Sequence, residues 1–186
     1  MILTARLFLE PITPEDADGI RLLAGDEAVA RSALNIPHPF EEGMAEAWIG
    51  GLKPDDVVLA IRQKGKDSII GMIGLIRDEV NESAELSYWI GRPYWGRGFA
   101  SEAAMAVVEY GFRSLGLNRI FATTLGRNAP SIRVLEKAGF TPEGCLRSHV
   151  KHWGQFEDLL YHGLLRKEYE SRGIRETSPE PGILSK

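Results

Sequence analysis

The first half of the chain alternates apolar and polar residues in short runs that are typical of β-strands. Four such runs predict strands, at residues 3–12, 57–61, 69–76 and 84–90. The polar segment 64–67 between the second and third runs predicts a hairpin. After the first run, Thr13 and Pro14 suit the start of a helix, and patchy helical patterning continues to Leu52 with a break at residues 36–39. This half is therefore predicted to form consecutive strands, with helices inserted after the first.

The pattern changes to a helical period near residue 101. Apolar residues at helical spacing predict a helix over 101–115, and a buried strand follows at 119–125. A second helix is predicted over 130–138, with Gly139 as its left-handed C-terminal stop. Two closing strands are predicted at 140–149 and 156–165. Helices that alternate with strands after a run of consecutive strands favour a mixed sheet covered on both faces, so the predicted fold class is α/β, a three-layer sandwich.

Length and composition fit one globular domain. The chain has 186 residues, of which 44% are hydrophobic, and this is enough to bury a core. We assign residues 1–170 to a single domain and predict that the polar, proline-containing tail 171–186 is disordered. No apolar run reaches membrane-spanning length and the N-terminus lacks the layout of a signal peptide. We therefore expect a cytoplasmic protein with no membrane partner.

Charge and cysteine content restrict the possible partners further. The formal net charge of −4 argues against nucleic-acid binding through a basic surface. Residues 1–93 carry an excess of acidic side chains, and residues 94–186 carry an excess of basic ones. This division would suit a cationic ligand on the first half and an anionic ligand on the second, but chance explains it equally well. The single cysteine, Cys145, excludes an internal disulfide framework and is expected to pack rather than react.

A glycine-containing loop leads directly into the long predicted helix. Gly96, Gly98 and Ala100 alternate with larger residues, so the backbone can curl and point successive N–H groups into one concavity. With the positive end of the helix behind it, such a loop can bind phosphate oxygens; a tight strand-to-helix turn is the other reading. A dinucleotide fold would need a third glycine, and a P-loop would need Gly-Lys-Ser/Thr. Both are absent.

Several blocks of the sequence resemble the GNAT N-acetyltransferase superfamily over roughly residues 2–168. The loop resembles that family's acetyl-CoA pyrophosphate loop, and residues 128–140 resemble its second cofactor motif. Residues 4–9, 84–90 and 143–147 are similar to the RimJ/RimL branch, which contains ribosomal-protein N-terminal acetyltransferases. The resemblance implies a mostly antiparallel sheet of about seven strands, splayed near its middle where the thioester binds. Trp95 occupies a place where the superfamily often has Gln or Arg, so only backbone groups are expected to face the pyrophosphate there.

The resemblance also implies roles for individual residues. Acetyl-CoA would be held by the loop, by strand residues beside the splay and by the second motif, a set that comprises Trp89, Ile90, Trp95, Gly96, Arg97, Gly98, Phe99, Ala100, Ser101, Asn128 and Arg133. Asn128 would bind the pantetheine arm, although it also suits a simple helix cap. Ser131 is the expected proton donor to the departing thiolate. Glu85, on the strand face opposite Leu86 and Tyr88, is the first candidate for general base; an exposed strand residue is the alternative.

The acceptor is expected to be an amine that attacks the thioester directly, because no activated nucleophile is visible. An α-amine with a pKa of about 7.8 is neutral far more often at pH 7 than a lysine with a pKa of about 10.4, which favours a protein or peptide N-terminus as the acceptor. A small-molecule amine and a catalytically silent acyl-CoA sensor are the alternatives. The histidines at 149, 152 and 162 do not have a metal-ligand spacing, so no metal is expected. A monomer and a homodimer fit equally.

Overall fold

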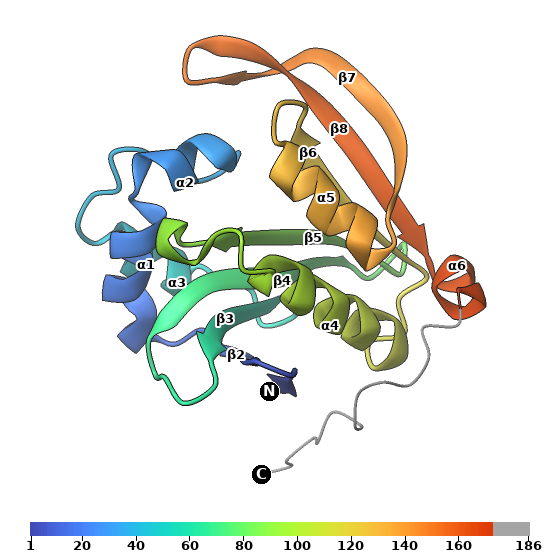
Figure 1. Ribbon diagram of the computed structural model, residues 1–186, viewed down its shortest axis with the longest axis horizontal. Helices are drawn as coiled ribbons and strands as arrows, with labels where there is room; N and C mark the ends of the chain where they lie inside the picture. The colour runs from blue at the N-terminus through green and yellow to red at the C-terminus, as the bar shows by residue number, and fades with distance from the viewer. Residues whose placement is uncertain (173–186) are drawn as a thin grey trace.

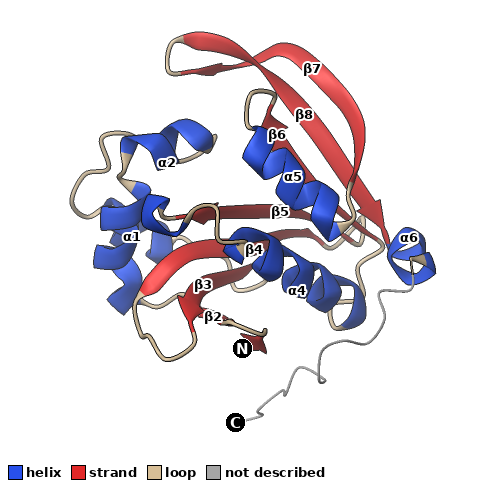
Figure 2. Ribbon diagram, in the orientation of Figure 1, coloured by secondary structure: helices blue, strands red, loops and turns tan. Residues whose placement is uncertain are grey.

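The computed structural model describes residues 1–172, which form a single sheet flanked by helices (Figures 1 and 2). The eight strands lie in the order β1-β2-β3-β4-β5-β6-β8-β7. Their bounds are β1 Ile2–Leu3, β2 Leu7–Pro11, β3 Val57–Gln63, β4 Ile69–Asp78, β5 Ser83–Ile90, β6 Arg119–Leu125, β7 Thr141–His152 and β8 Gln155–Leu165. Every neighbouring pair is antiparallel except β5 and β6, which are parallel. The predicted mixed, mostly antiparallel sheet is confirmed.

The predicted strand at 3–12 is wrong as one element, because it is two strands joined by a turn. The Thr4 hydroxyl accepts the backbone N–H of Leu7 at 3.0 Å, and the N–H of Thr4 donates to the Leu7 carbonyl at 3.1 Å. The chain therefore reverses direction, and β1 pairs with β2. The resemblance implied about seven strands, and residues 1–172 form eight. The turn at Thr4 accounts for the additional strand, since alternation of apolar residues does not reveal where a strand folds back.

Helices cover both faces of the sheet, as predicted. Their bounds are α1 Ala17–Ala24, α2 Glu27–Ser32, α3 Met44–Gly50, α4 Phe99–Arg113, α5 Ala129–Ala138 and α6 Arg166–Ser171, with 3-10 turns at Pro14–Asp16 and Arg92–Tyr94. Helix α1 packs on β4 and on α3, and α4 packs on β4 and β5 from the other side. The helix predicted over 101–115 begins and ends two residues earlier. Gly139, with φ of 96°, ends α5 in the predicted left-handed conformation.

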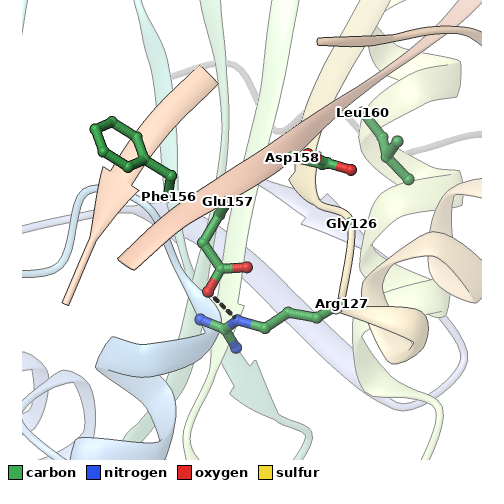
Figure 3. Close-up of a pocket in the computed structure, with 6 residues that line it drawn as sticks. All are labelled: Gly126, Arg127, Phe156, Glu157, Asp158 and Leu160. Atoms are coloured by element: carbon green, nitrogen blue, oxygen red, sulfur yellow. Dashed lines mark hydrogen bonds and ion pairs between the residues drawn. The ribbon is translucent and has the colours of Figure 1, made fainter. Parts of the chain in front are cut away.

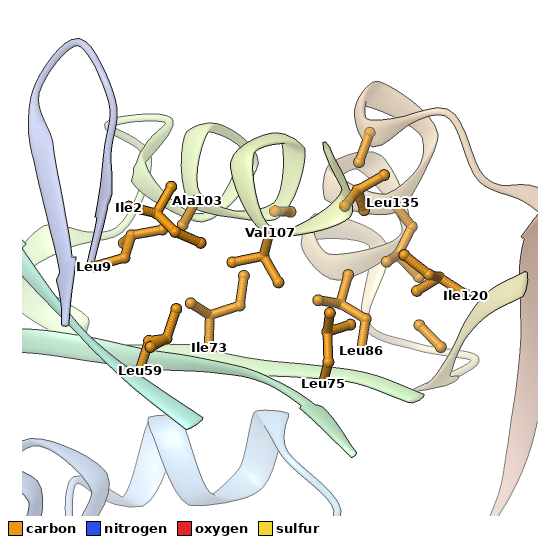
Figure 4. Close-up of a cluster of buried hydrophobic side chains, with 14 of the residues drawn as sticks. Ile2, Leu9, Leu59, Ile73, Leu75, Leu86, Ala103, Val107, Ile120 and Leu135 are labelled. Carbon is orange, nitrogen blue, oxygen red and sulfur yellow. The ribbon is translucent and has the colours of Figure 1, made fainter. Parts of the chain in front are cut away.

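The larger core lies between the sheet and α4 and α5 (Figure 4). Leu9, Leu59, Ile73 and Leu75 point from the strands toward Val107 of α4, and each of these side chains is buried. A smaller cluster on the other face joins α1 to β4 and includes Trp89 of β5. Because β5 is buried from both sides, its position is fixed by two separate apolar layers.

Strands β5 and β6 separate in the middle of the sheet. They pair only from Ser83 with Arg119 to Glu85 with Phe121, although β5 continues to Ile90 and β6 to Leu125. Throughout the length of β6, the other edge stays paired with β8. Within residues 1–172, the edge of β5 after Glu85 therefore has no strand beside it, and the splay that the resemblance implied is present.

Strands β7 and β8 form a long hairpin that extends beyond the rest of the sheet (Figure 1). Its two-residue turn, Trp153 and Gly154, has positive φ at both positions, which suits the twist of a hairpin. Cys145 lies exposed on β7, so the expectation that it packs is wrong. The predicted disordered tail falls, from residue 173 onward, outside the described residues. Among residues 1–172, no helix is both long enough and apolar enough to cross a membrane.

Candidate active site

The glycine loop between β5 and α4 presents a row of backbone donors. Gly96 and Gly98 have φ of 73° and 78°, conformations that only glycine adopts without strain. The first helical bond of α4 runs from the N–H of Glu102 to the Gly98 carbonyl at 3.1 Å. Within the described chain, the N–H groups of residues 96–101 donate to no protein acceptor. The loop, which we call the cradle, therefore has the backbone arrangement that suits binding of an anion at a helix N-terminus.

The cradle is braced from behind by the turn between β1 and β2, a contact that sequence reasoning did not anticipate. The Thr4 hydroxyl and the backbone N–H of Arg6 donate to one oxygen of Glu102 at 2.6 and 2.7 Å, and Arg6 Nε donates to the other at 2.6 Å. Arg6 Nη1 also donates to the Arg97 carbonyl at 3.0 Å. Burial opposes ionisation of Glu102, but these hydrogen bonds lower the pKa of its carboxyl below the usual value.

The residues at the loop fit a pyrophosphate through main-chain groups rather than side chains. Phe99 and Ser101 are buried, so each offers only its N–H. Trp95 Nε1 donates to the Ile90 carbonyl at 2.5 Å and so ties the loop to the end of β5. The side chains of Trp89 and Ile90 are also buried, which leaves their backbone at the open strand edge. The predicted cofactor-binding residues of the loop and of β5 are thus brought together.

Two exposed arginines lie on the predicted cofactor-binding segments. Arg97 lies in the loop and Arg133 lies on α5, and both are exposed. Arg127, just before α5, is used elsewhere: its Nε is 2.7 Å from Glu157 Oε1 and its Nη2 donates to the Arg31 carbonyl at 2.7 Å. Arg97 and Arg133 are therefore better placed than Arg127 to meet a phosphate.

Glu85 occupies the last position at which β5 and β6 pair. Its Oε1 accepts a hydrogen bond from Thr123 Oγ1 of β6 at 2.9 Å. The side chain is half-buried and faces the α1 side of the sheet, the same side as Trp89 and opposite Leu86 and Tyr88, as the alternation predicted. A carboxylate fixed in this way at the start of the opening can accept a proton from a group that enters there.

Ser131 reaches the same opening from the other side of the sheet. Asn128 caps α5 by accepting the Ser131 N–H at 3.1 Å, which confirms the capping interpretation, and its Nδ2 donates to the Ser32 carbonyl at 2.9 Å. The Ser131 hydroxyl lies 2.7 Å from the hydroxyl of Tyr88. A base candidate and an acid candidate therefore border the opening from opposite faces, an arrangement suited to attack on one side and departure of a leaving group on the other.

The acidic residues between positions 16 and 46, in the half of the chain with the acidic excess, differ in their surroundings. Asp16 is buried and pairs with Arg62 at 2.7 Å, Asp26 caps α2, and Glu27 pairs with Arg31 at 2.7 Å, so their roles are structural. Three others are exposed and make no ion pair within the described residues; they are Glu41, Glu42 and Glu46, all near the start of α3. These three carboxylates are open to a cationic ligand, and so is Asp18, which is exposed and lies 3.6 Å from Arg21.

An open cavity of about 430 Å³ lies where β6 ends and β8 begins (Figure 3). It is lined by Gly126, Arg127, Phe156, Glu157, Asp158 and Leu160, and the Arg127–Glu157 ion pair crosses one side of it. None of these residues belongs to the predicted site. In residues 1–172, no three His, Cys, Asp or Glu side chains converge in a metal-binding arrangement.

Known proteins match the parts of the chain that form this site. A family model described as the acetyltransferase (GNAT) domain matches residues 6–141, a range that contains the loop, Glu85 and Ser131. An uncharacterised N-acetyltransferase of Bacillus licheniformis, p20, is 37% identical over 172 residues, which cover 89% of this chain and 96% of p20. YdaF of Bacillus subtilis, provisionally assigned as a ribosomal N-acetyltransferase, is 38% identical over 104 residues, 55% of this chain and 57% of YdaF.

One solved structure shares the fold at low sequence identity. Spermidine N-acetyltransferase from Vibrio cholerae, solved in complex with CoA and spermine, superposes with a TM-score of 0.79. The two chains are 22% identical, and the alignment covers 88% of this chain and 98% of the other. At that identity, the likeness is one of fold.

Proposed function

The chain belongs to the GNAT acetyltransferase family and is an acetyl-CoA-dependent N-acetyltransferase, and from this premise we propose that it transfers the acetyl group to a primary amine by direct attack. One observation carries this proposal. The opening between β5 and β6 has the carboxylate of Glu85 on one face and the hydroxyl of Ser131 on the other, beside a loop with free backbone donors. The candidate base and the candidate acid therefore border one opening in the sheet, and the glycine loop follows the far end of its β5 edge.

Each group has a defined task in the proposed reaction. Acetyl-CoA supplies the acetyl thioester, and the N–H groups of residues 96–101 hold its pyrophosphate oxygens. Glu85, steadied by Thr123, takes a proton from the amine as the new C–N bond forms. A backbone N–H on the unpaired edge of β5 stabilises the negative charge that develops on the carbonyl oxygen. Ser131 then gives its hydroxyl proton to the departing thiolate.

We propose a protein or peptide N-terminal α-amine as the acceptor and membership of the RimJ/RimL branch. The similarity to YdaF supports this assignment. The chemistry of the site supports it too. An α-amine, whose pKa is about 7.8, is neutral at pH 7 more often than a lysine, whose pKa is about 10.4, so it depends less on a single carboxylate for deprotonation.

A polyamine or another small cationic amine is the second candidate. Its support is the fold shared with the spermidine N-acetyltransferase and the three exposed carboxylates near α3 that make no ion pair within residues 1–172. Multiple carboxylates favour an acceptor with more than one positive charge.

A thiol-release assay with acetyl-CoA distinguishes these acceptors. The panel consists of short peptides with free N-termini, the same peptides with blocked N-termini, spermidine, spermine and single amino acids. Turnover confined to free N-terminal peptides supports the first candidate, and turnover on spermidine or spermine supports the second. Calorimetric binding of acetyl-CoA without turnover on any amine would mean that the chain is a silent acyl-CoA sensor, and the proposal would be wrong.

Neutralising the carboxylates before α3 tests whether they recognise a cationic acceptor. We expect the double variant Glu41→Gln, Glu42→Gln to raise the acceptor KM about three- to fivefold, the effect of losing two exposed charge interactions. The difference from wild type should shrink as salt is added, because exposed charges are screened. Glu170→Gln on α6 is the matched control. An unchanged acceptor KM at low salt would contradict the assignment.

A further inference from the structure

Tyr88 makes a contact with the site that the sequence did not reveal. It lies on β5, and its side chain faces α4 and α5 together with Leu86. Its hydroxyl oxygen is 2.7 Å from Ser131 Oγ, a pair in which either oxygen can be the donor, and 3.2 Å from the Ser131 carbonyl oxygen. The phenol is thus held at two atoms of the residue expected to protonate the leaving group.

The hydrogen bond between Tyr88 and Ser131 lies at the opening between β5 and β6. Pairing between β5 and β6 ends at Glu85, and Tyr88 comes three residues later on the unpaired part of β5. Ser131 lies in the first turn of α5, which packs beside β6. The Tyr88–Ser131 bond therefore bridges the two sides of the opening at the place where the proposed reaction requires an acid.

A serine hydroxyl by itself is a poor acid, because the alkoxide left behind is strongly basic. A hydrogen bond donated to that oxygen stabilises the developing charge, and it also leaves the serine proton free to point away from the donor. Burial raises the pKa of Tyr88 to about 12, against the smaller opposing effect of its bond to Ser131. The phenol therefore keeps its proton at neutral pH and remains able to donate.

We propose that Tyr88 is a positioning residue for Ser131, donating a hydrogen bond to Ser131 Oγ and directing the serine proton toward the leaving thiolate. This inference rests on the proposed function. In the step concerned, the C–S bond breaks and its electron pair goes to sulfur, which takes the Ser131 proton to become the thiol. Ser131 regains a proton from solvent, and the proton that Glu85 took from the amine returns to solvent, so the exchange balances. Tyr88 keeps its own proton throughout.

A double-mutant cycle tests whether the effect of Tyr88 on kcat depends on the presence of Ser131. We expect Tyr88→Phe to lower kcat about 10- to 100-fold, the usual cost of losing one hydrogen bond to a group that becomes charged. The KM for acetyl-CoA should change little. Ser131→Ala should lower kcat at least as much, and Tyr88→Phe added to Ser131→Ala should cause no further loss, because the two residues act as one unit.

Additive losses in the double variant, or an unchanged kcat in Tyr88→Phe, would overturn the inference. Tyr110→Phe on α4 is the matched control, since Tyr110 is half-buried in the same core and makes no hydrogen bond to Ser131. Thermal melting of all variants checks that the fold is retained, and Phe preserves the shape of the ring. Wild-type turnover separates the two levels of failure: no turnover on any amine rejects the proposed function and the inference with it, whereas normal turnover with an additive cycle rejects the inference alone.

Discussion

Glu85→Gln is expected to lower kcat by about 100- to 10,000-fold, the range that a positioned general base contributes. Gln has nearly the same shape, and its amide oxygen can still accept the Thr123 hydroxyl, so the variant removes the proton acceptor without removing the contact. Acetyl-CoA affinity should be unchanged, because the cradle at residues 96–101 lies at the other end of the unpaired edge of β5. Steady-state thiol release measures kcat, and calorimetry measures the affinity for acetyl-CoA.

Glu79→Gln is the control for this prediction, because Glu79 is an exposed carboxylate in the turn that precedes β5. It should leave both measurements at the wild-type values. A kcat for Glu85→Gln close to that of wild type would show that another group takes the amine proton. A parallel loss of acetyl-CoA affinity would place Glu85 among the binding residues instead.

Gly98→Trp is expected to weaken acetyl-CoA binding by about 100-fold or more, through loss of several backbone hydrogen bonds to a charged ligand. Gly98 has φ of 78°, and a Cβ there would lie 3.5 Å from Arg6 Nη2, so a large side chain must either displace Arg6 or extend over the cradle. Either result removes the alignment of the free N–H groups. Calorimetric titration with acetyl-CoA measures the change in Kd.

Two further variants separate obstruction from backbone strain. Gly65 also has φ of 78°, lies in the turn between β3 and β4, and has nothing within 4 Å of a Cβ. Gly65→Trp therefore imposes the same strain away from the site and should leave acetyl-CoA affinity unchanged. Gly98→Ala keeps the strain with a small side chain and should bind more tightly than Gly98→Trp. Equal affinities for Gly98→Trp and wild type would show that the loop is not the pyrophosphate site.

Much of the fold followed from local pattern. The strand predicted at 119–125 has its observed bounds because an apolar and β-branched segment lies there between clear breaks, and Gly139 is predictable because a helix end favours a residue with positive φ. The turn at Thr4 was missed because a serine or threonine hydroxyl that binds a nearby N–H leaves no trace in apolar alternation. Helix α6 was missed as well, since its six residues are too short for a periodic signal.

The site was predictable to the extent that its chemistry is local. The glycine loop and the helix cap at Asn128 are short segments whose residue types determine their backbone conformation, so they could be read from the sequence. The partners of these segments come from distant parts of the chain: Arg6 lies 91 residues before Arg97, and Tyr88 lies 43 residues before Ser131. Hydrogen bonds across such separations depend on strand order and register, which no local pattern encodes.

The sequence alone determined that this chain carries a glycine loop at a helix N-terminus, a carboxylate on one face of the preceding strand and a serine at the start of a later helix. Each of these depends on backbone conformations and periodicities that neighbouring residues fix. Only the tertiary structure decided that the carboxylate and the serine border the same opening, because the parallel pairing of β5 and β6 stops at Glu85. It also gave Glu85 its Thr123 partner and Ser131 its Tyr88 partner, since side chains from separate elements meet only after the sheet and its two helical layers have packed.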